Sequence, residues 1–333
     1  MGLFDQFISI DIKKNMGIAG LTDEFFAVYL NNLKKKNRNI LVVVNSLFEA
    51  NNLYSSLSNY TDKCYLFPMD DFLTSEALAI SPDLQITRLE TINEIVKEAD
   101  GVMVARGDLG VQLPTERIPL AQKAIIRACR QYGKPVITAT QMLDSMIRNP
   151  RPTRAEVTDV ANAIYDGTSA IMLSGETAAG HFPVEAVRTM VRIAERAEND
   201  INYKNRFFHL EKKKSPNTTD AICHATCTTA YDLGASAIVT VTKSGTSARM
   251  ISRYRPDCMI IAGSTDEKVC RQLNLSWGVN PILLKEKQDV FSLFEHVVEI
   301  GKRQGYLEIG QLVVITSGVP MGISGTTNML KVH

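Results

Sequence analysis

Three short apolar runs in the middle of the chain constrain its fold more than any other feature. They cover residues 102–105, 135–139 and 170–173, and an amphipathic helical pattern follows each of them. Runs of four or five apolar residues between turn-forming residues are typical of strands buried on both faces of a parallel sheet. The pattern recurs about every 35 residues, which is typical of successive βα units. Residues 101–176 are therefore predicted to form an α/β fold with a parallel sheet.

Small and polar residues follow each apolar run directly. The carboxyl ends of parallel strands meet at one edge of a sheet, and chemistry in α/β folds gathers at that edge. These residues therefore form the candidate site. They are Arg106, Gly107, Asp108, Thr140, Gln141, Ser174 and Glu176.

The size and charge of the chain exclude several classes of protein. Its 333 residues suggest two or three domains. The 37 basic and 36 acidic residues leave a net charge of +1, which gives no reason to expect nucleic acid or an acidic membrane as a partner. No apolar run approaches the ~20 residues of a transmembrane helix, and the N-terminus lacks the order of a secretion signal. These features predict a cytoplasmic protein.

The six cysteines are scattered along the chain and lie mostly among apolar neighbours. A long chain without a close-set cysteine framework is typical of the reducing cytosol. Cys223, His224 and Cys227 share one helical stretch and could suggest a metal site. No second pair of ligands accompanies them, so packing in a core is the favoured interpretation.

Residues 1–96 are predicted to form a short α/β segment. Helical spacing covers 22–33 and 47–57, and Asn45-Ser46 can cap the second helix. The apolar runs 40–44 and 64–67 are interpreted as strands. The basic cluster at 34–39 could contact nucleic acid, but a solvated loop between helix and strand is favoured.

Elements in the rest of the chain follow from helix-stop and strand patterns. Helices are expected at 119–132, 153–165 and 183–198, with Gly133 and Gly167 ending the first two. Residues 204–217 are interpreted as a linker. Residues 218–333 are predicted to form a second α/β unit. Its strands are expected at 237–241, 259–262, 281–284, 312–316 and 328–332, and its helices at 220–233, 248–254, 268–274 and 290–303.

Two resemblances to known families meet in residues 90–96. The stretch FPMDDFLTSEALAISPDLQITRLETINEIV, residues 67–96, resembles the N-terminal region of bacterial transcription-repair coupling factors over about residues 1–96. The likeness implies a repair-factor interaction module. The chain has no G-x-x-x-x-G-K-[ST] phosphate loop, so it implies no ATPase.

The second resemblance covers about residues 92–333. The motifs GVMVARGDLGVQLP at 101–114 and KPVITATQMLDSMIRNPRPTRAEVTDVANAIYDGTSAIMLSGETAAG at 134–180 resemble the second half of the catalytic barrel of pyruvate kinase. This resemblance implies the last three βα units of a (β/α)8 TIM barrel at 97–203, followed by the C-terminal α/β domain of that family at 218–333. The junction of two families suggests a joined or rearranged coding sequence.

The pyruvate kinase resemblance implies phosphoryl transfer from phosphoenolpyruvate to ADP, giving pyruvate and ATP. It implies that Asp108 is one of two carboxylate ligands of a catalytic Mg²⁺. It also implies that the backbone amides at Arg106, Gly107 and Asp108 receive the substrate carboxylate. Thr140 resembles the threonine that contacts the transferring phosphoryl group.

Three further candidates keep a structural alternative. Ser174 and Glu176 resemble the serine and glutamate where the family's proton pathway has been placed, but either can equally act as a structural cap. Arg154 resembles an arginine in a segment beside the active site, or it can pair with Glu156 or Asp159.

Catalytic residues that the family carries upstream of this segment are replaced by other residues in this chain. The family's Lys-Ile-Glu supplies a lysine beside the phosphoryl group and the second metal ligand, whereas residues 82–84 are Pro-Asp-Leu. The K⁺ ligands, the earlier barrel strands and the nucleotide-capping domain are also not found. Because phosphoryl transfer depends on positioned positive charge, the chain is predicted to be largely inactive, and three βα units are predicted to leave the barrel unclosed.

The last unit carries a candidate effector site. Hydroxyls and amides precede the helix expected at 248–254, and a glycine-rich loop at 317–327 follows a strand. Together they resemble the pocket in which family members bind a phosphorylated allosteric activator, and a chance Ser/Gly turn is the alternative. The residues are Thr242, Lys243, Ser244, Gly245, Thr246, Ser247, Gly322 and Gly325.

Three function classes follow from these patterns. The first is a pyruvate kinase, with a homotetramer implied by the family. The second is a non-catalytic chain that binds a sugar phosphate or partner subunits through residues 218–333. The third is a repair-factor module in residues 1–96.

Overall fold

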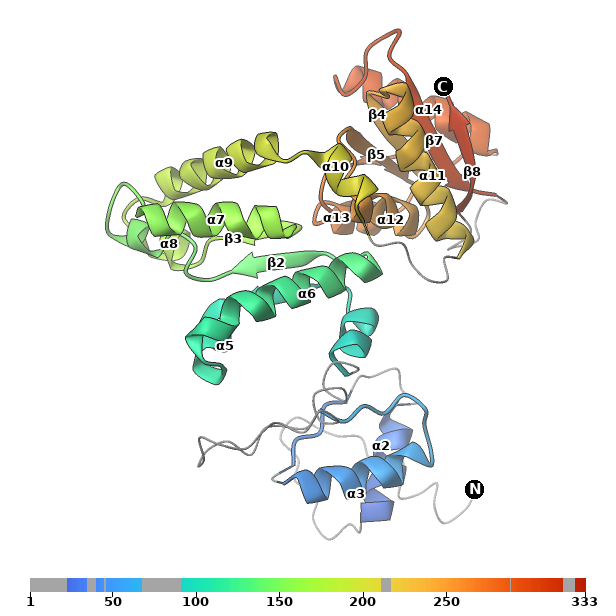
Figure 1. Cartoon of the computed structure of the whole chain (residues 1–333). Coiled ribbons are helices and arrows are strands. Elements are labelled where there is room, and N and C mark those ends of the chain that lie inside the picture. Colours follow the sequence, from blue (N-terminus) through green and yellow to red (C-terminus); the bar gives the residue numbers. More distant parts are fainter. Residues whose placement is uncertain are drawn as a thin grey trace. The chain divides into compact units, whose positions relative to one another are not determined.

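A computed structural model describes residues 23–34, 40–44, 46–67, 91–210, 217–287, 289–319 and 327–333 (Figure 1). The chain divides into two compact units, Met1–Ile95 and Val96–His333. No helix within the described ranges is both long and apolar enough to cross a bilayer.

In the described residues of the first unit, two helices pack on each other. Helices α2 (Asp23–Lys34) and α3 (Leu47–Ser58) meet around Ala27, Leu30 and Leu53. The expected cap of the second helix is confirmed, since the Ser46 hydroxyl accepts a hydrogen bond from the Glu49 amide at 3.2 Å.

The two strands expected in this unit are wrong for the described residues. Residues 40–44 and 61–67 are irregular and belong to no sheet. Val42 and Val44 pack against the helices, whereas Leu41 and Val43 are 90% and 84% exposed. A single apolar run can bury only one side against two helices, and without a neighbouring strand its backbone makes no ladder.

The second unit opens with the predicted parallel sheet. Strands β1 (Val102–Ala105), β2 (Val136–Ala139) and β3 (Ala170–Met172) are parallel and lie in the order β1-β2-β3. Val104 pairs with Thr138, which pairs with Ile171, so the three carboxyl ends share one edge. Within the described part of the chain, β1 and β3 each have a strand neighbour on one side only.

Helices follow each strand, and their ends obey local capping chemistry. Helix α6 (Ile118–Tyr132) ends at Gly133, whose φ is 65°, and α7 (Arg154–Asp166) ends at Gly167, whose φ is 96°. Thr153 and Glu156 form a reciprocal capping box at the start of α7. The remaining elements of this segment are α5 (Arg106–Gln112), η1 (Thr115–Arg117), η2 (Asp144–Ile147), α8 (Gly175–Ala178) and α9 (Pro183–Asp200).

The proposed linker at 204–217 is wrong in its first part. Tyr203–Phe208 forms helix α10, and Phe207 is 2% exposed. Its ring packs in the core of the following domain and stacks on His224 at 5.1 Å. Residues 211–216 lie outside the described ranges. The burial of Phe207 could not be predicted from its polar neighbours in the sequence, because it depends on a surface formed by distant residues.

A five-stranded sheet forms the last domain. Its order is β6-β5-β4-β7-β8, parallel except for the antiparallel β8. The strands are β4 (Ala237–Val241), β5 (Met259–Ser264), β6 (Val279–Leu283), β7 (Val313–Gly318) and β8 (Thr327–Val332). The helices are α11 (Thr218–Leu233), α12 (Thr246–Tyr254), α13 (Glu267–Leu273) and α14 (Val290–Arg303). Each strand and helix expected here is present within a few residues of its predicted ends.

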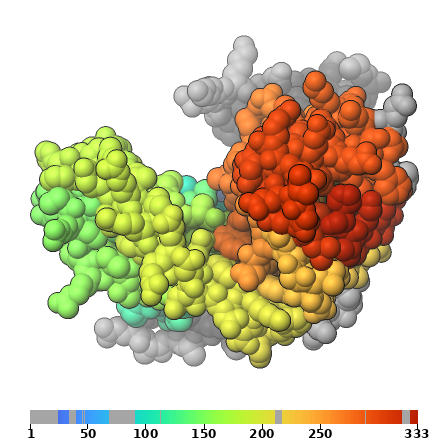
Figure 2. All heavy atoms as spheres, turned by 90° about the horizontal axis from the view of Figure 1, so that it is seen from above, coloured from blue at the N-terminus to red at the C-terminus, as the bar shows by residue number. Residues whose placement is uncertain are grey.

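Both faces of this sheet are buried, as the apolar strand runs predict. Ile238 and Val314 face a core shared with α11, α12 and α13, whereas Val239 and Ile315 face a core shared with α14. Figure 2 shows the barrel segment, green to yellow, and the last domain, orange to red, as two lobes of the second unit.

The cysteine interpretation is confirmed for Cys223 and Cys227. Both side chains are fully buried in the core beneath α11, and burial raises the pKa of the Cys223 thiol to about 12. A thiol held neutral in an apolar core packs as a small hydrophobic side chain.

Candidate active site

The carboxyl end of β2 carries local backbone strain. Thr140 and Gln141 follow the strand directly and have φ values of 69° and 53°. A left-handed conformation at a residue with a side chain costs about 1–3 kcal/mol and persists only where surrounding contacts hold it. Such strain is common at functional sites, and here it falls on two of the predicted site residues.

Arg106 supplies the contacts that hold this bend. Its side chain is 8% exposed. Nε and Nη2 donate to the carbonyl oxygen of Thr140 at 3.1 and 2.7 Å, and Nη2 also donates to that of Gln141 at 3.1 Å. Nη1 donates to both carboxylate oxygens of Asp159 on α7, at 2.7 and 2.6 Å. The guanidinium therefore ties the end of β2 to α7 and points into the protein rather than toward a substrate.

The Thr140 hydroxyl is oriented by the neighbouring strand end. Its Oγ1 accepts a hydrogen bond from the Gly107 amide at 2.8 Å. The hydroxyl proton is therefore left to be donated elsewhere. In this structure the Gly107 N–H, one of the three amides expected to receive a substrate carboxylate, donates inside the protein.

Asp108 lies in the first turn of α5, which begins directly after β1. Gly107 and Gly110, on either side of Asp108, lie within the same helix. The Asp108 side chain is exposed and makes no hydrogen bond or ion pair with the described residues. Within those residues, no three His, Cys, Asp or Glu side chains come together as a metal cluster. Asp108 is therefore a single available oxygen ligand.

Ser174 and Glu176 lie at the same edge of the sheet, directly after β3. Glu176 is 2% exposed, and its carboxylate accepts hydrogen bonds from the amides of Leu143 at 3.0 Å and Ser174 at 2.7 Å. These contacts join the loops after β2 and β3. The Ser174 hydroxyl is buried without a hydrogen-bond partner among the described residues. A buried hydroxyl of this kind is expected to find a partner in water or a ligand.

Glu156 and Asp159, the two acids proposed as partners of Arg154, make hydrogen bonds to other residues. Asp159 pairs with Arg106. Glu156 accepts from Ser145 and Thr153, with its shortest contact, to Ser145 Oγ, at 2.6 Å. Burial raises the pKa of Glu156, but these hydrogen bonds outweigh it and lower the pKa below its ordinary value. The missed feature is the Arg106–Asp159 pair, which joins residues 53 positions apart and leaves no local signal.

The candidate effector loop joins β4 to α12. Gly245 has a φ of 78° and precedes the helix, which has no side-chain cap. Thr242 Oγ1 accepts from the Gly245 amide at 3.0 Å, and the Ser247 hydroxyl is buried against Thr327 Oγ1 at 2.6 Å. These two hydroxyls therefore shape the loop. Lys243 is exposed, and Ser244 and Thr246 share a hydroxyl contact at 2.9 Å. Gly322 and Gly325 lie outside the described residues.

The fold and the site together define a class. Three consecutive βα units with polar strand ends, one of them strained, are part of a barrel-type α/β architecture, and a second α/β domain is joined to them. Residues 84–187 match the family described as pyruvate kinase, barrel domain, and residues 220–333 match pyruvate kinase, alpha/beta domain. Through these two domains the chain belongs to the pyruvate kinase family.

Individual relatives agree with the family matches. A pyruvate kinase of Clostridium acetobutylicum is 54% identical over 245 residues, which are 74% of this chain and 52% of that protein. One from Sporosarcina psychrophila is 52% identical over 245 residues, 74% of this chain and 42% of that protein. A crystal structure of a pyruvate kinase from Cryptosporidium parvum superimposes with a TM-score of 0.69 at 40% identity, covering 74% of this chain and 49% of that one.

The similarity extends over only part of each relative. The chain spans about half the length, or less, of the curated relatives it matches. The family matches begin at residue 84 and do not support the resemblance of residues 1–96 to transcription-repair coupling factors.

Proposed function

We propose that residues 84–333 supply one side of a pyruvate kinase active site together with that enzyme's effector-binding domain. We further propose that the 333-residue polypeptide by itself transfers phosphate only slowly. The observation that carries the first proposal is the junction of β1 and β2, where the Arg106 clamp and the Gly107 amide orient the Thr140 hydroxyl.

The proposed reaction moves the phosphoryl group of phosphoenolpyruvate to ADP. The bond from phosphorus to the enol oxygen breaks, a bond from phosphorus to an ADP β-phosphate oxygen forms, and the enolate takes up a proton at carbon to give pyruvate. Thr140 Oγ1 accepts from Gly107 and so has its own proton free to donate to a phosphoryl oxygen. The buried Ser174 hydroxyl lies after the neighbouring strand and is available for proton transfer.

The pyruvate kinase resemblance implies Mg²⁺ and K⁺. An exposed carboxylate at a strand end, with no partner among the described residues, suits Mg²⁺, which accepts one or two protein carboxylates and fills its other positions with water and substrate. Bound there, the ion would neutralise phosphoryl charge. Asp108 is the residue proposed to hold it. No residue of this chain is proposed as a K⁺ ligand.

A binding measurement tests this proposal. Mg²⁺ is expected to tighten phosphoenolpyruvate binding to the chain about tenfold, and Asp108→Asn is expected to remove that gain, because loss of a ligand or its support typically costs 10–100-fold in metal affinity. Isothermal titration calorimetry with phosphoenolpyruvate, with and without Mg²⁺, measures both effects.

Asp144→Asn is the matched control. Asp144 is an exposed acid in η2, after the neighbouring strand β2, and the same substitution removes the same charge. It is expected to leave the Mg²⁺ effect unchanged. Equal losses in the two variants, or no Mg²⁺ effect in the original chain, would rule out Asp108 as the ligand.

The α12 loop supports a second function, binding of a phosphorylated effector. The helix begins without a side-chain cap, so its first backbone amides are not satisfied by a capping side chain, and the helix N-terminus favours an anion. The exposed Lys243 and the Ser244–Thr246 hydroxyl pair lie beside it. This function does not require catalysis by the same chain.

Gly245→Ala is expected to weaken sugar-phosphate binding at least about tenfold. An added Cβ would strain a φ of 78° and would lie 2.8 Å from Arg249 Nη1 and 3.2 Å from Leu273, so the loop must move. Titration calorimetry with a panel of sugar bisphosphates measures the effect.

Gly234→Ala provides the comparison. Its φ of 60° carries similar strain, but a Cβ there meets nothing within 4 Å. It is expected to cost stability alone. If both glycine variants bind sugar phosphates as the original chain does, the loop is not the effector site.

Two further proposals rest on sequence alone. The repair-factor module in residues 1–96 is tested by a pull-down with nucleotide-excision-repair proteins, and the homotetramer implied by the family is tested by sedimentation.

A further inference from the structure

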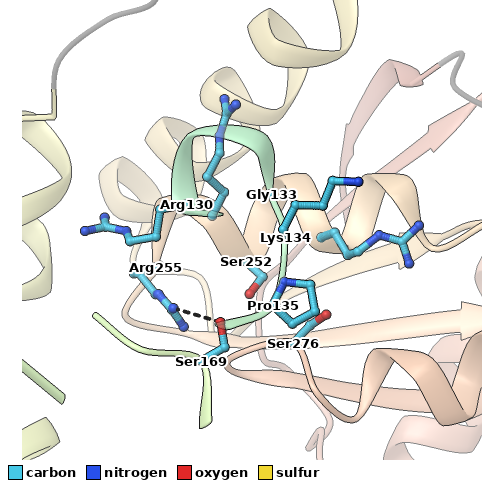
Figure 3. Close-up of a pocket in the computed structure, with 10 residues that line it drawn as sticks. Arg130, Gly133, Lys134, Pro135, Ser169, Ser252, Arg255 and Ser276 are labelled. Atoms are coloured by element: carbon cyan, nitrogen blue, oxygen red, sulfur yellow. Dashed lines mark hydrogen bonds between the residues drawn. The ribbon is translucent and has the colours of Figure 1, made fainter. Parts of the chain in front are cut away.

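A small cavity lies where the barrel segment meets the last domain (Figure 3). Its volume is about 260 Å³, counting the part open to solvent. The barrel segment contributes the end of α6 and the residues that begin β2 and β3, and the last domain contributes α12 and the turn after α13. The lining residues are Arg130, Gly133, Lys134, Pro135, Ser169, Arg249, Ser252, Arg253, Arg255 and Ser276.

The charge of this lining is one-sided. Five of the ten residues are cations, namely Arg130, Lys134, Arg249, Arg253 and Arg255, and none is an acid. Arg253 is neutralised behind the cavity by Asp220 at 2.9 Å. Glu198, the acid that accepts from Trp277 at 3.2 Å, does not line the cavity. Most of the positive charge is thus not paired within the lining.

Arg255 is the most unusual member of the set. It is 4% exposed, and its guanidinium lies over the Trp277 ring at 4.8 Å. Nη2 donates to the carbonyl oxygens of Gly167 at 2.8 Å and Thr168 at 3.3 Å, and it approaches Ser169 Oγ at 3.4 Å, the contact drawn in Figure 3. Nε and Nη1 are buried, and neither has a hydrogen-bond partner within the described part of the chain. A buried, charged donor left in this state is costly unless something accepts from it.

Arg130, on the barrel side of the cavity, also has a buried guanidinium nitrogen. Its Nε finds no hydrogen-bond partner among the residues that the structure describes, so this donor is unused by them. Burial, together with the nearby charges of Arg206 and Arg253, lowers the pKa of Arg130 to about 10, so the group is still charged at neutral pH. The barrel segment and the last domain thus each contribute to the cavity lining an arginine with hydrogen-bond donors that the described residues leave unused.

We propose that this cavity binds one small oxyanion of the phosphate class, and that the bound anion joins the barrel segment to the last domain. A tetrahedral oxyanion offers several acceptors at once, which suits guanidinium donors arriving from α6 and from α12. The space is smaller than a typical ligand pocket, which favours a single anionic group over a whole nucleotide. The site is separate from the effector loop, although Arg249 reaches from its lining to the Ser244 carbonyl at 2.7 Å.

Inorganic phosphate is the probe for the test. The full 333-residue chain is titrated with potassium phosphate in a calorimeter, and its thermal midpoint is followed in phosphate and in potassium chloride of equal ionic strength. Arg130→Gln is expected to raise the phosphate Kd at least about tenfold, since hydrogen bonds between charged groups are among the strongest in proteins. Lys134→Gln, a second lining variant, is expected to raise it several-fold.

Arg127→Gln is the matched control, because Arg127 lies one turn earlier on the same helix and is exposed. It is expected to keep the phosphate Kd of the original chain. Comparing the two variants separates specific binding from the general stabilisation of folded proteins by phosphate. Without phosphate, Arg130→Gln is expected to melt no lower than the original chain, because it relieves repulsion among the arginines.

Three results would overturn the proposal. The first is no phosphate response in the original chain beyond that of chloride. The second is an equal response in the Arg130 and Arg127 variants. The third is loss of binding in Thr246→Val with full binding in Arg130→Gln, which would assign the phosphate to the effector loop.

Discussion

The 333-residue chain is expected to form pyruvate from phosphoenolpyruvate and ADP at least about 10⁴-fold more slowly than a complete pyruvate kinase such as that of Clostridium acetobutylicum. Residues 82–84, Pro-Asp-Leu, stand where the family's Lys-Ile-Glu is expected. Removal of a single preorganised electrostatic group typically costs 10²–10³-fold, and weakened metal binding adds to this. Arg106 cannot substitute for the lysine, because its guanidinium is bound to Asp159 and to the end of β2.

A lactate dehydrogenase coupled assay, run with Mg²⁺ and K⁺, measures the rate of both proteins. Any residual rate is expected to fall further in Thr140→Val, which removes the hydroxyl and keeps the shape of the side chain. A rate within tenfold of the complete relative would contradict the proposal that the chain supplies only one side of the site. Residual activity unchanged by Thr140→Val would instead point to a contaminating kinase.

Arg106→Ala is expected to destabilise the second unit by about 3 kcal/mol. Removing one partner of a mostly buried ion pair leaves its acid without compensation, and such changes typically cost 3–5 kcal/mol. The loss is expected at the lower end of this range because the Asp159 side chain is 37% exposed and water can partly replace the lost contacts. The carbonyls of Thr140 and Gln141 also lose their donors, so the strained bend should relax.

Urea unfolding followed by circular dichroism measures this loss, which corresponds to a fall of about 6–12 °C in the melting midpoint for a unit of this size. Arg148→Ala is the control, because Arg148 is an exposed arginine in the loop after η2. Arg106→Lys should recover only part of the stability, since an ammonium cannot make the same bidentate contact. Equal midpoints for the Arg106 and Arg148 alanine variants would show that the clamp contributes nothing.

Local chemistry explains which parts of the fold could be predicted. The strands at 102–105 and 237–241 are short apolar runs that pair in parallel register, and the second is buried on both faces as its uninterrupted apolar pattern predicts. In the first, Met103 is 47% exposed. The ends of α7 are equally local, since Thr153 and Glu156 cap its start and Gly167 ends it. The runs at 40–44 and 64–67 failed as strands because an apolar run becomes a strand only when another segment pairs with it.

The composition of the candidate site could be predicted, but its internal contacts could not. The polar residues after each strand share one edge because parallel register requires it. Their roles depend on partners far along the chain. Gly107 donates to Thr140 across 33 residues, and Glu176 accepts from Leu143 across the same separation. These contacts place Gly107 and Glu176 in the hydrogen-bond network that joins the strand ends.

The sequence by itself therefore determined the α/β class, the order of strands and helices, the pyruvate kinase resemblance and the residues at the strand ends. Each of these depends on periodicity, capping or motif, which are properties of neighbouring residues. Only the tertiary structure decided that Arg106 faces inward and that Arg130 and Arg255 line one cavity. Burial and pairing of a charge depend on what the folded chain brings beside it, and residues more than a hundred positions apart leave no trace of that in their order.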